Sequence, residues 1–367
     1  KLVIVGVFFN YNTTRRKYIA RLNTDGSLDS SFQTNPGADW HVRTVALQPD
    51  GKMLVSGDFS NYDGIARKRI ARIHGNGSVD ASFDSGAGPN NTVLAYAVQP
   101  DGKIVVGGGF TVFDGIPRGY IARLHADGSL DPSFAVGVGA DSAVTQIVRL
   151  SDGKLLIGGY FTSYGGAPRG RIARLESDGQ LDLTFDPGAG LDNTVRAVEL
   201  LSDGRILVGG VFSTYNAVAR NRVARLHSNG ALDTSFDPGA GLGVWVTCIA
   251  VQSDGRVLVG GNSQSSGVLA RLFPDGSPDN SLAPNTGAGN SLSKVHALPD
   301  GKLLVAGDTW EFGVFQKRGV ARLHVDGTAD LSFNALPGPS DTVGCIIRQP
   351  DGKHLIAGNF RSYSGIA

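Results

Sequence analysis

A short motif recurs seven times along the chain and constrains the fold more than any other feature. It reads Asp-Gly-Lys or Asp-Gly-Arg, followed by an apolar run and a glycine. Successive copies are separated by 51 residues, except for one interval of 46, and they begin at positions 50, 101, 152, 203, 254, 300 and 351. Self-similarity at such a period is typical of a repeat architecture rather than of unrelated domains.

Each repeat divides into four short strand-like runs, which we call A, B, C and D. In the second repeat they cover Val42–Gln48, Lys52–Gly57, Arg69–Ile73 and Ser78–Phe83. Short runs of this kind, bounded by Gly, Pro, Asn and Asp, predict strands, and no helical periodicity interrupts them. A joins B, and C joins D, through Asp-Gly or Asn-Gly, which favour tight hairpins. The B–C and D–A connections are longer.

This pattern predicts an all-β fold, a seven-bladed β-propeller of four-stranded antiparallel blades forming one domain over residues 1–367. Run B occurs eight times, counting residues 1–6 and 353–358, whereas A, C and D occur seven times. A closed ring therefore requires Val343–Gln349 to lie beside the C and D runs of the first repeat. The N- and C-terminal strands would then pair in one blade, and which terminal B run completes it stays open.

The repeat resembles a known family. Residues 101–134, which read DGKIVVGGGFTVFDGIPRGYIARLHADGSLDPSF, show the consensus well and resemble the delta-60 repeat, a β-propeller repeat of unknown function. The resemblance spans the whole chain and implies a bacterial protein that is secreted or exposed at the cell surface, and often large and modular. It brings no catalytic residues. Because the chain opens at Lys1 inside a strand pattern, we interpret it as a piece of a longer protein.

Composition and spacing argue against several classes of function. The formal net charge is +1 and no stretch is strongly basic, so no nucleic-acid partner is expected. No apolar run approaches 20 residues, so no membrane insertion is expected. Cys248 and Cys345 occupy one position of run A in different repeats, which favours small buried residues over a disulfide. The histidines lack ligand spacing and calcium-loop motifs are missing, so neither a metal nor a cofactor is expected.

Polar residues that recur in every repeat are interpreted as scaffold. The Arg of the I-A-R-L run and the Asp of run D each occur seven times and lie on runs predicted to pair. We therefore expect an Arg–Asp contact in each repeat. A catalytic interpretation would require seven identical active sites.

An aromatic residue and a cation also recur in the B–C connection. They could pack on each other as cation–π pairs, or form a rim that offers a stacking surface to a glycan or peptide. The candidate rim residues are Tyr62, Arg67, Phe113, Arg118, Tyr164, Arg169, Tyr215 and Arg220.

Residues that occur in one repeat only are the better candidates for binding. Trp40 and His41 lie in the first D–A connection and Trp245 in the fifth, and the seventh B–C connection adds Trp310, Glu311 and Phe315. Both kinds of connection emerge on the same side of a meander, so one binding face is expected. The sixth repeat lacks five residues in its B–C connection, which predicts a notch in that face.

The sequence therefore favours a non-catalytic extracellular scaffold that recognises a glycan or a protein through its long loops. It would act as a monomeric ring or as a module of a larger chain. One alternative is a hydrolase or lyase with its site in the central funnel, although no nucleophile–base pair or metal set is visible and paired carboxylates are not indicated. The other alternative is a purely structural spacer.

Overall fold

The computed structural model describes residues 2–5, 10–11, 14–15, 18–22, 29–32, 36–241, 243–262, 267–282, 292–312, 315–333, 343–348 and 354–358. All regular elements in these residues are β-strands. The chain groups into two compact units, mainly Arg15–Val195 and Arg196–Ala367, and each is described by itself. No helix in the described part has the length and hydropathy that a membrane crossing requires.

Runs A, B and C form strands close to the predicted bounds. Run A forms β5 (Val42–Leu47), β10 (Val93–Val98), β15 (Val144–Arg149), β20 (Val195–Leu200), β25 (Trp245–Val251), β28 (Leu292–Ala297) and β31 (Val343–Arg348). Run B forms β1 (Leu2–Val5), β6 (Met53–Gly57), β11 (Ile104–Gly108), β16 (Leu155–Gly159), β21 (Ile206–Gly210), β26 (Val257–Asn262), β29 (Leu303–Phe312) and β32 (His354–Gly358). Run C forms β4 (Ile19–Leu22), β9 (Ile70–Ile73), β14 (Ile121–Leu124), β19 (Ile172–Leu175), β24 (Val223–Leu226), β27 (Gly267–Leu272) and β30 (Phe315–Leu323).

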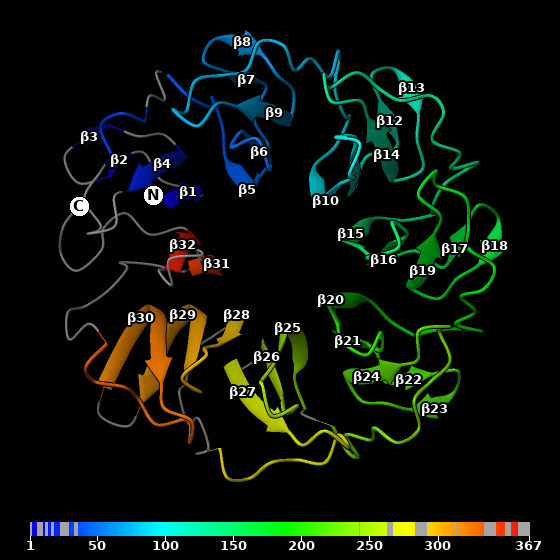
Figure 1. The fold of residues 1–367 in the computed structure, drawn as a ribbon, viewed down its shortest axis with the longest axis vertical. Helices are drawn as coiled ribbons and strands as arrows, with labels where there is room; N and C mark the ends of the chain where they lie inside the picture. Colours follow the sequence, from blue (N-terminus) through cyan, green and yellow to red (C-terminus); the bar gives the residue numbers. More distant parts are fainter. Residues whose placement is uncertain are drawn as a thin grey trace. The chain divides into compact units, whose positions relative to one another are not determined.

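Within a repeat these strands form a three-stranded antiparallel sheet with run B in the centre. The second repeat gives the order β5-β6-β9, and the following repeats give β10-β11-β14 and so on (Figure 1). The central strand is fully buried in β6, β11, β16 and β21, and Ser56 of β6 is the one side chain with a polar group in these four strands. Continuous burial is expected where a strand is covered on both faces by neighbouring sheets.

The prediction that run D forms a fourth strand is wrong. In the described residues run D pairs with run C only through a single β-bridge, as between Ile73 and Val79. The reason is the aspartate that follows. The Asp80 carboxylate accepts hydrogen bonds from the backbone N–H of Ser82 at 3.0 Å and from its hydroxyl at 2.6 Å. These bonds fold the chain into a turn directly after the bridge, since Asx-type bonds compete with strand pairing.

The B–C connection contains a small two-stranded hairpin that the sequence pattern did not reveal. In the second repeat β7 (Asn61–Tyr62) pairs with β8 (Ile65–Ala66) through a turn in which Asp63 and Gly64 both have positive φ, 50° and 76°. Two central residues of this kind make the twisted turn that suits hairpins. The equivalent strands are β2 (Asn10–Tyr11), β3 (Thr14–Arg15), β12 (Val112–Phe113), β13 (Ile116–Pro117), β17 (Ser163–Tyr164), β18 (Ala167–Pro168), β22 (Thr214–Tyr215) and β23 (Val218–Ala219).

The sixth and seventh repeats replace this small hairpin with a direct one. In the sixth, β26 and β27 pair as far as Asn262 and Gly267. In the seventh, β29 and β30 continue to the pair Phe312 and Phe315. The sixth and seventh repeats therefore differ from the others in the B–C connection itself rather than in the sheet below it.

The strands nearest the two ends of the sequence form two-stranded sheets. β1 pairs with β4, and β31 pairs with β32 through the local hairpin register, from Val343 opposite Gly358 to Arg348 opposite His354. Both terminal B runs are therefore strands with partners of their own. Pairing between the N- and C-terminal strands, and with it a closed seven-bladed ring, stays a prediction.

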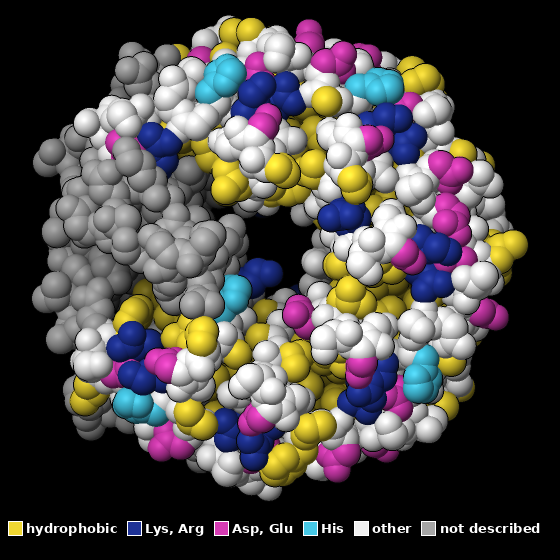
Figure 2. Space-filling model, viewed as in Figure 1, with side chains coloured by type: hydrophobic (Ala, Val, Ile, Leu, Met, Phe, Trp, Pro, Cys, Tyr) yellow, Lys and Arg dark blue, Asp and Glu magenta, His cyan; other side chains and the backbone are white. Residues whose placement is uncertain are grey.

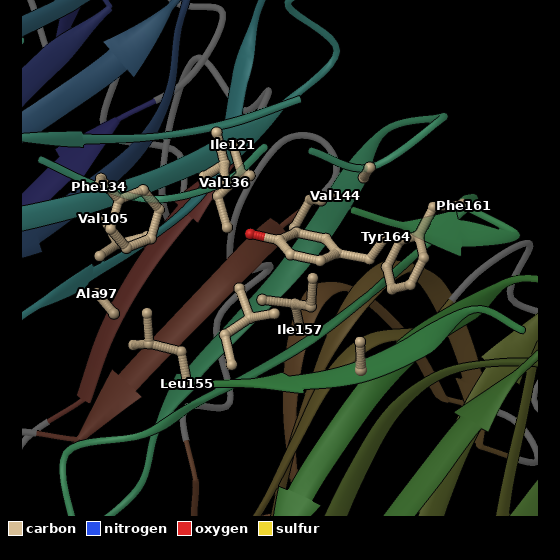
Figure 3. Packing of buried hydrophobic residues seen from close by; sticks show 13 residues of the cluster. Ala97, Val105, Ile121, Phe134, Val136, Val144, Leu155, Ile157, Phe161 and Tyr164 are labelled. Atoms are coloured by element: carbon tan, nitrogen blue, oxygen red, sulfur yellow. The ribbon is translucent and has the colours of Figure 1, made fainter. Parts of the chain in front are cut away.

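Consecutive sheets pack through interlocking apolar side chains. In the first unit the Tyr164 ring lies among Val144, Ile157 and Phe161, with its hydroxyl directed inward (Figure 3). Glycine near the end of run B allows the next sheet to approach closely. A Cβ on Gly107 would lie 2.8 Å from Val144 of the following repeat, which is closer than carbon atoms pack.

The hairpin turn of the fifth repeat generates a stability prediction. Ala217 occupies the position of Gly64, Gly115 and Gly166 and is held at φ 64° on an exposed turn. An L-residue in the left-handed region costs roughly 1–2 kcal/mol, part of which glycine's greater chain entropy offsets. We expect Ala217→Gly to raise the free energy of unfolding by about 0.5–1 kcal/mol in urea titrations. The reverse change, Gly115→Ala, should lower it, and equal midpoints for both variants would contradict this explanation.

Candidate functional site

The recurring Arg–Asp pair is a buried polar hub in each repeat. In the second repeat, Asp80 Oδ2 accepts hydrogen bonds from Arg72 Nε at 2.7 Å and from Lys52 Nζ at 3.0 Å. Oδ1 accepts the two bonds from Ser82, and the Asp80 backbone N–H donates to the Arg72 carbonyl at 2.8 Å. The predicted contact occurs in all seven repeats: Arg21–Asp29 2.6 Å, Arg72–Asp80 2.7 Å, Arg123–Asp131 2.7 Å, Arg174–Asp182 2.6 Å, Arg225–Asp233 2.6 Å, Arg271–Asp279 2.7 Å and Arg322–Asp330 2.8 Å.

The same arginine also reaches the next repeat. Arg123 Nη1 donates at 2.7 Å to the carbonyl of Ser177, which lies in the following C–D turn. Its guanidinium lies over the Phe134 ring, with Cζ 4.8 Å from the centroid. Figure 2 shows dark-blue cations beside magenta carboxylates at the surface of several repeats. The hub carboxylates of the described residues accept hydrogen bonds from within the protein, which agrees with the interpretation of the recurring pair as scaffold.

The hub also fixes the ionisation of its aspartate. Burial acts to raise the pKa of Asp131, but hydrogen bonds from Ser133, Lys103 and Arg123 outweigh it and hold that pKa well below the usual range. The pKa values of five further hub aspartates are lowered for the same combination of reasons. These are Asp80, Asp182, Asp233, Asp279 and Asp330. These carboxylates stay charged near neutral pH and are unsuited to donating a proton.

The recurring aromatics of the B–C connection are buried, which corrects their candidacy as a ligand-binding rim. Tyr62, Phe113, Tyr164 and Tyr215 are each at most 1% exposed. The Tyr164 hydroxyl donates to the Gly179 carbonyl at 2.8 Å, so the ring fastens the small hairpin to the C–D turn. The sequence could not distinguish this burial from exposure because aromatic residues are common in both settings.

The four recurring cations do not stack on these aromatics. Arg67, Arg118, Arg169 and Arg220 each donate to the carbonyl of the residue before them. Arg67 and Arg220 are buried, and each also faces a carboxylate, Asp84 at 3.4 Å and Asp237 at 3.6 Å respectively. In six repeats the cation–π contact belongs to the hub arginine instead, and in the sixth repeat Arg256 lies over Phe273.

Trp40 and His41 form an exposed aromatic pair in the first unit. The Trp40 side chain is 53% exposed and stacks on His41, with centroids 4.9 Å apart and planes inclined by 25°. Asp39 holds the loop beneath them, because its carboxylate accepts bonds from the Ser60 and Asn61 backbone N–H groups at 2.8 and 3.0 Å. The pair therefore stands next to the B–C hairpin of its repeat, the end at which we predicted binding.

Trp245 is the first residue of β25 rather than part of a loop. It pairs with Asn262, the residue at which the shortened B–C connection of the same sheet begins. The short connection lets the A–B pairing continue by one residue, which is why the predicted loop position is strand. Trp245 remains 36% exposed, with the Arg196 guanidinium over its ring at 5.7 Å.

The three candidates of the seventh repeat lie on the long β29–β30 hairpin and not in an irregular loop. Trp310 pairs with Lys317 and Glu311 with Gln316, and Phe315 pairs with Phe312 near the tip. A hairpin supplies its own backbone hydrogen bonds, so the connection needs no extra loop. The gathering of all three tryptophans on one face stays a prediction, since Trp40 belongs to the first unit and the other two to the second.

The structure draws attention to charged residues that sequence reasoning missed, on the A strands of the second unit. Arg196 and Glu199 lie on β20, and Lys294 and His296 on β28. Burial raises the pKa of the Glu199 carboxyl, and the charge of Lys294 only partly opposes this. The signal was present in the sequence. Glu199 and Lys294 each occur once at their repeat position, where the other repeats have mostly small or apolar residues.

Cys248 is buried and free, and burial raises its thiol pKa to about 12. Its predicted role as a small buried residue is confirmed, while the side chain of Cys345 lies outside the described residues. Within the described ranges, no three His, Cys, Asp or Glu side chains are grouped closely enough to hold a metal ion.

The hub predicts the effect of removing its arginine. We expect Arg123→Ala to lower the free energy of unfolding by about 1–3 kcal/mol, because Asp131 and the Ser177 carbonyl lose a buried donor. Urea denaturation followed by circular dichroism measures this. Arg118→Ala, in the same repeat but bonded only to the Pro117 carbonyl, is the matched control and should cost less. Equal losses of unfolding free energy for the two variants would show that the hub stabilises the fold no more than an ordinary surface contact does.

Acid stability follows from the lowered aspartate pKa values. A carboxyl whose pKa is lower in the folded than in the unfolded chain contributes stability that is complete above the unfolded value, about 3.9. This stability is lost as the pH falls through that value toward the folded pKa. We expect urea midpoints to be steady from about pH 7 to 5 and to fall steeply below it. Asp131→Asn should reduce the steepness, and a midpoint unchanged at pH 3.5 would exclude this linkage.

Comparison with solved structures agrees with the sheet architecture. The chain is similar to the WD40 β-propeller domain of Doa1, with a TM-score of 0.56, 13% identity, and coverage of 87% of this chain and 90% of that one. It is also similar to the extracellular domain of BT4673 from B. thetaiotaomicron, with a TM-score of 0.51 and 16% identity over 88% of this chain. This chain spans only 38% of the length of that domain. At these identities the likeness concerns the fold alone.

Comparison with curated protein sequences gives no match. A family model described as a β-propeller domain of unknown function, DUF5122, matches seven segments of the chain. They are residues 1–32, 48–83, 99–134, 150–185, 201–236, 252–282 and 298–333. The resemblance to the delta-60 repeat is thereby confirmed, since each matched segment contains the B, C and D runs with their Arg–Asp hub. The chain belongs to the DUF5122 β-propeller family.

Proposed function

We propose that this protein is a non-catalytic binding module, exposed outside a bacterial cell, that recognises a glycan or a protein. The observation that carries this proposal is the contrast between repeated and unrepeated residues. The repeated Arg–Asp pairs and B–C aromatics are bonded or buried inside the fold. By contrast, the side chains of Trp40 and Trp245, which occur once, remain 53% and 36% exposed. Exposed aromatic residues on a rigid scaffold are favoured at recognition surfaces.

The local setting of Trp40 supports a role in binding. Its ring is held by stacking on His41, and the loop below is fastened by Asp39. A preformed aromatic surface loses little conformational entropy when a ligand covers it. Tryptophan offers a broad apolar face together with a hydrogen-bond donor, which suits both a sugar ring and a protein surface.

The extracellular location is supported by one relative of the fold. BT4673, whose similar domain is extracellular, has the same type of architecture over most of this chain. The family membership and the balanced charge are compatible with a module of a larger surface protein. The module would act as a monomer, with its ligand at the end of the sheets that carries the B–C connections.

The test is a binding screen of the whole chain against glycan and protein arrays, followed by variants. We expect Trp40→Ala or Trp245→Ala to weaken binding of any ligand found by about tenfold or more, with an unchanged melting temperature, because a buried aromatic contact is lost. Leu47→Ala, which removes another exposed apolar side chain, is the matched control. Normal binding by both tryptophan variants, with loss of binding after substitutions in the Asp-Gly turns, would show that the opposite end binds.

A further inference from the structure

One repeat position has the same arginine in two repeats with opposite surroundings. Arg43 on β5 and Arg196 on β20 each lie seven residues before the Asp-Gly motif of their repeat. Arg43 Nε donates to Asp58 Oδ2 at 2.8 Å, so its charge is neutralised within the protein. The residue that corresponds to Asp58 beside Arg196 is Val211. The second unit has therefore kept the cation and lost its counterion.

A second substitution accompanies the first. In the first unit, Asp58 Oδ1 also accepts a hydrogen bond from the hydroxyl of Thr92, which belongs to the following repeat. The residue equivalent to Thr92 in the second unit is Trp245. In the first unit an Arg–Asp ion pair is hydrogen-bonded to a threonine hydroxyl. In the second unit the Arg196 guanidinium instead lies over the Trp245 ring, with Cζ 5.7 Å from the centroid. Stacking on an aromatic face orients a guanidinium while leaving its N–H groups free to donate.

Lys294 adds a second cation to the same surface. Its strand, β28, contacts β25, and its charge acts on both Glu199 and Cys248. Cys248 lies three residues along β25 from Trp245, which is roughly 10 Å of strand. Within the described residues, neither Lys294 nor Arg196 has a carboxylate at ion-pair distance. By contrast, Arg205 and Arg225 of this unit both pair with Asp233.

Glu199 lies near these cations without satisfying them. Its carboxyl is partly buried, and no other acidic residue lies on β20, β25 or β28. The surface formed by Arg196, Trp245 and Lys294 therefore carries a net positive charge in a protein that is almost neutral overall. Charge left unpaired beside an exposed aromatic ring is complementary to an anionic group attached to an apolar body.

We propose that Arg196, Trp245 and Lys294 form a binding site for an acidic saccharide, one whose sugar rings carry carboxylates. The inference rests on the binding function proposed above and narrows its ligand class. The C–H face of a sugar ring covers indole, and a carboxylate accepts paired hydrogen bonds from the planar guanidinium. Lys294, on the adjoining strand β28, is the group that would meet a second carboxylate of the same saccharide.

The test measures binding of the whole chain to oligogalacturonate by calorimetry, with maltohexaose as the neutral comparison. We expect Arg196→Gln to weaken the binding of oligogalacturonate roughly tenfold or more, since a hydrogen-bonded charge contact is lost. Val211→Asp should weaken it as much, because it restores the counterion that Asp58 supplies to Arg43 while leaving Arg196 and Trp245 in place. Arg43→Gln is the matched control and should bind as the parent chain does.

Salt and competing anions identify the chemistry. Binding should weaken between 50 and 300 mM NaCl, because an exposed charge contact is screened. Equal inhibition by millimolar phosphate would show a general anion site and overturn the saccharide assignment, as would tighter binding of polyglutamate. Binding of oligogalacturonate that survives both Arg196→Gln and Val211→Asp would place the ligand elsewhere. If the chain binds only a neutral glycan or a protein through Trp40, the binding function stands and this site falls.

Discussion

A buried aspartate carboxylate is the interaction on which each repeat depends. Asp80 and its equivalents accept hydrogen bonds from the arginine of run C, the cation of the Asp-Gly-Lys/Arg motif and the following serine or threonine. These donors come from three segments of the repeat: run C, the start of run B and the turn within run D. A charge removed from water is tolerated when its bonds are complete, and removing one partner then costs more than the pair contributes. The spacing of the whole repeat follows from bringing these groups together.

The sequence was sufficient for the three paired runs of each repeat, because seven copies of one pattern average out accidents of composition. Runs A, B and C, their turns and the Arg–Asp contacts follow from seven copies of one pattern. Run D was misjudged because its alternation resembles a strand, although Asp80 and Ser82 bend the chain after one bridge. A hydrogen bond between a side chain and a nearby backbone outweighed strand propensity there.

The candidate site was less accessible to sequence reasoning. Trp40 and Trp245 were found because they occur once. For the recurring Tyr62 and Arg67 the sequence left packing and a ligand-binding rim both open, because a pattern does not report burial, and both side chains are buried. Arg196, Glu199 and Lys294 were missed because they lie inside a strand pattern that was interpreted only for its apolar residues. Comparing each position across the repeats finds them, since a charge that appears in one copy has no part in the shared framework.

The contact between the hub arginine and the next repeat has a consequence for how such chains change. In the five repeats for which the described residues show this contact, the acceptor is a backbone carbonyl, and it is supplied by five different residues: Gly75, Ala126, Ser177, Pro274 and Val325. A carbonyl is present whatever side chain occupies the position. The contact between one repeat and the next therefore does not depend on the side chain at the acceptor position. A duplicated or transplanted unit would carry both the arginine that donates this hydrogen bond and the carbonyl that accepts it. Gene duplication can therefore lengthen or reorder such an array, while the exposed end of each unit diverges.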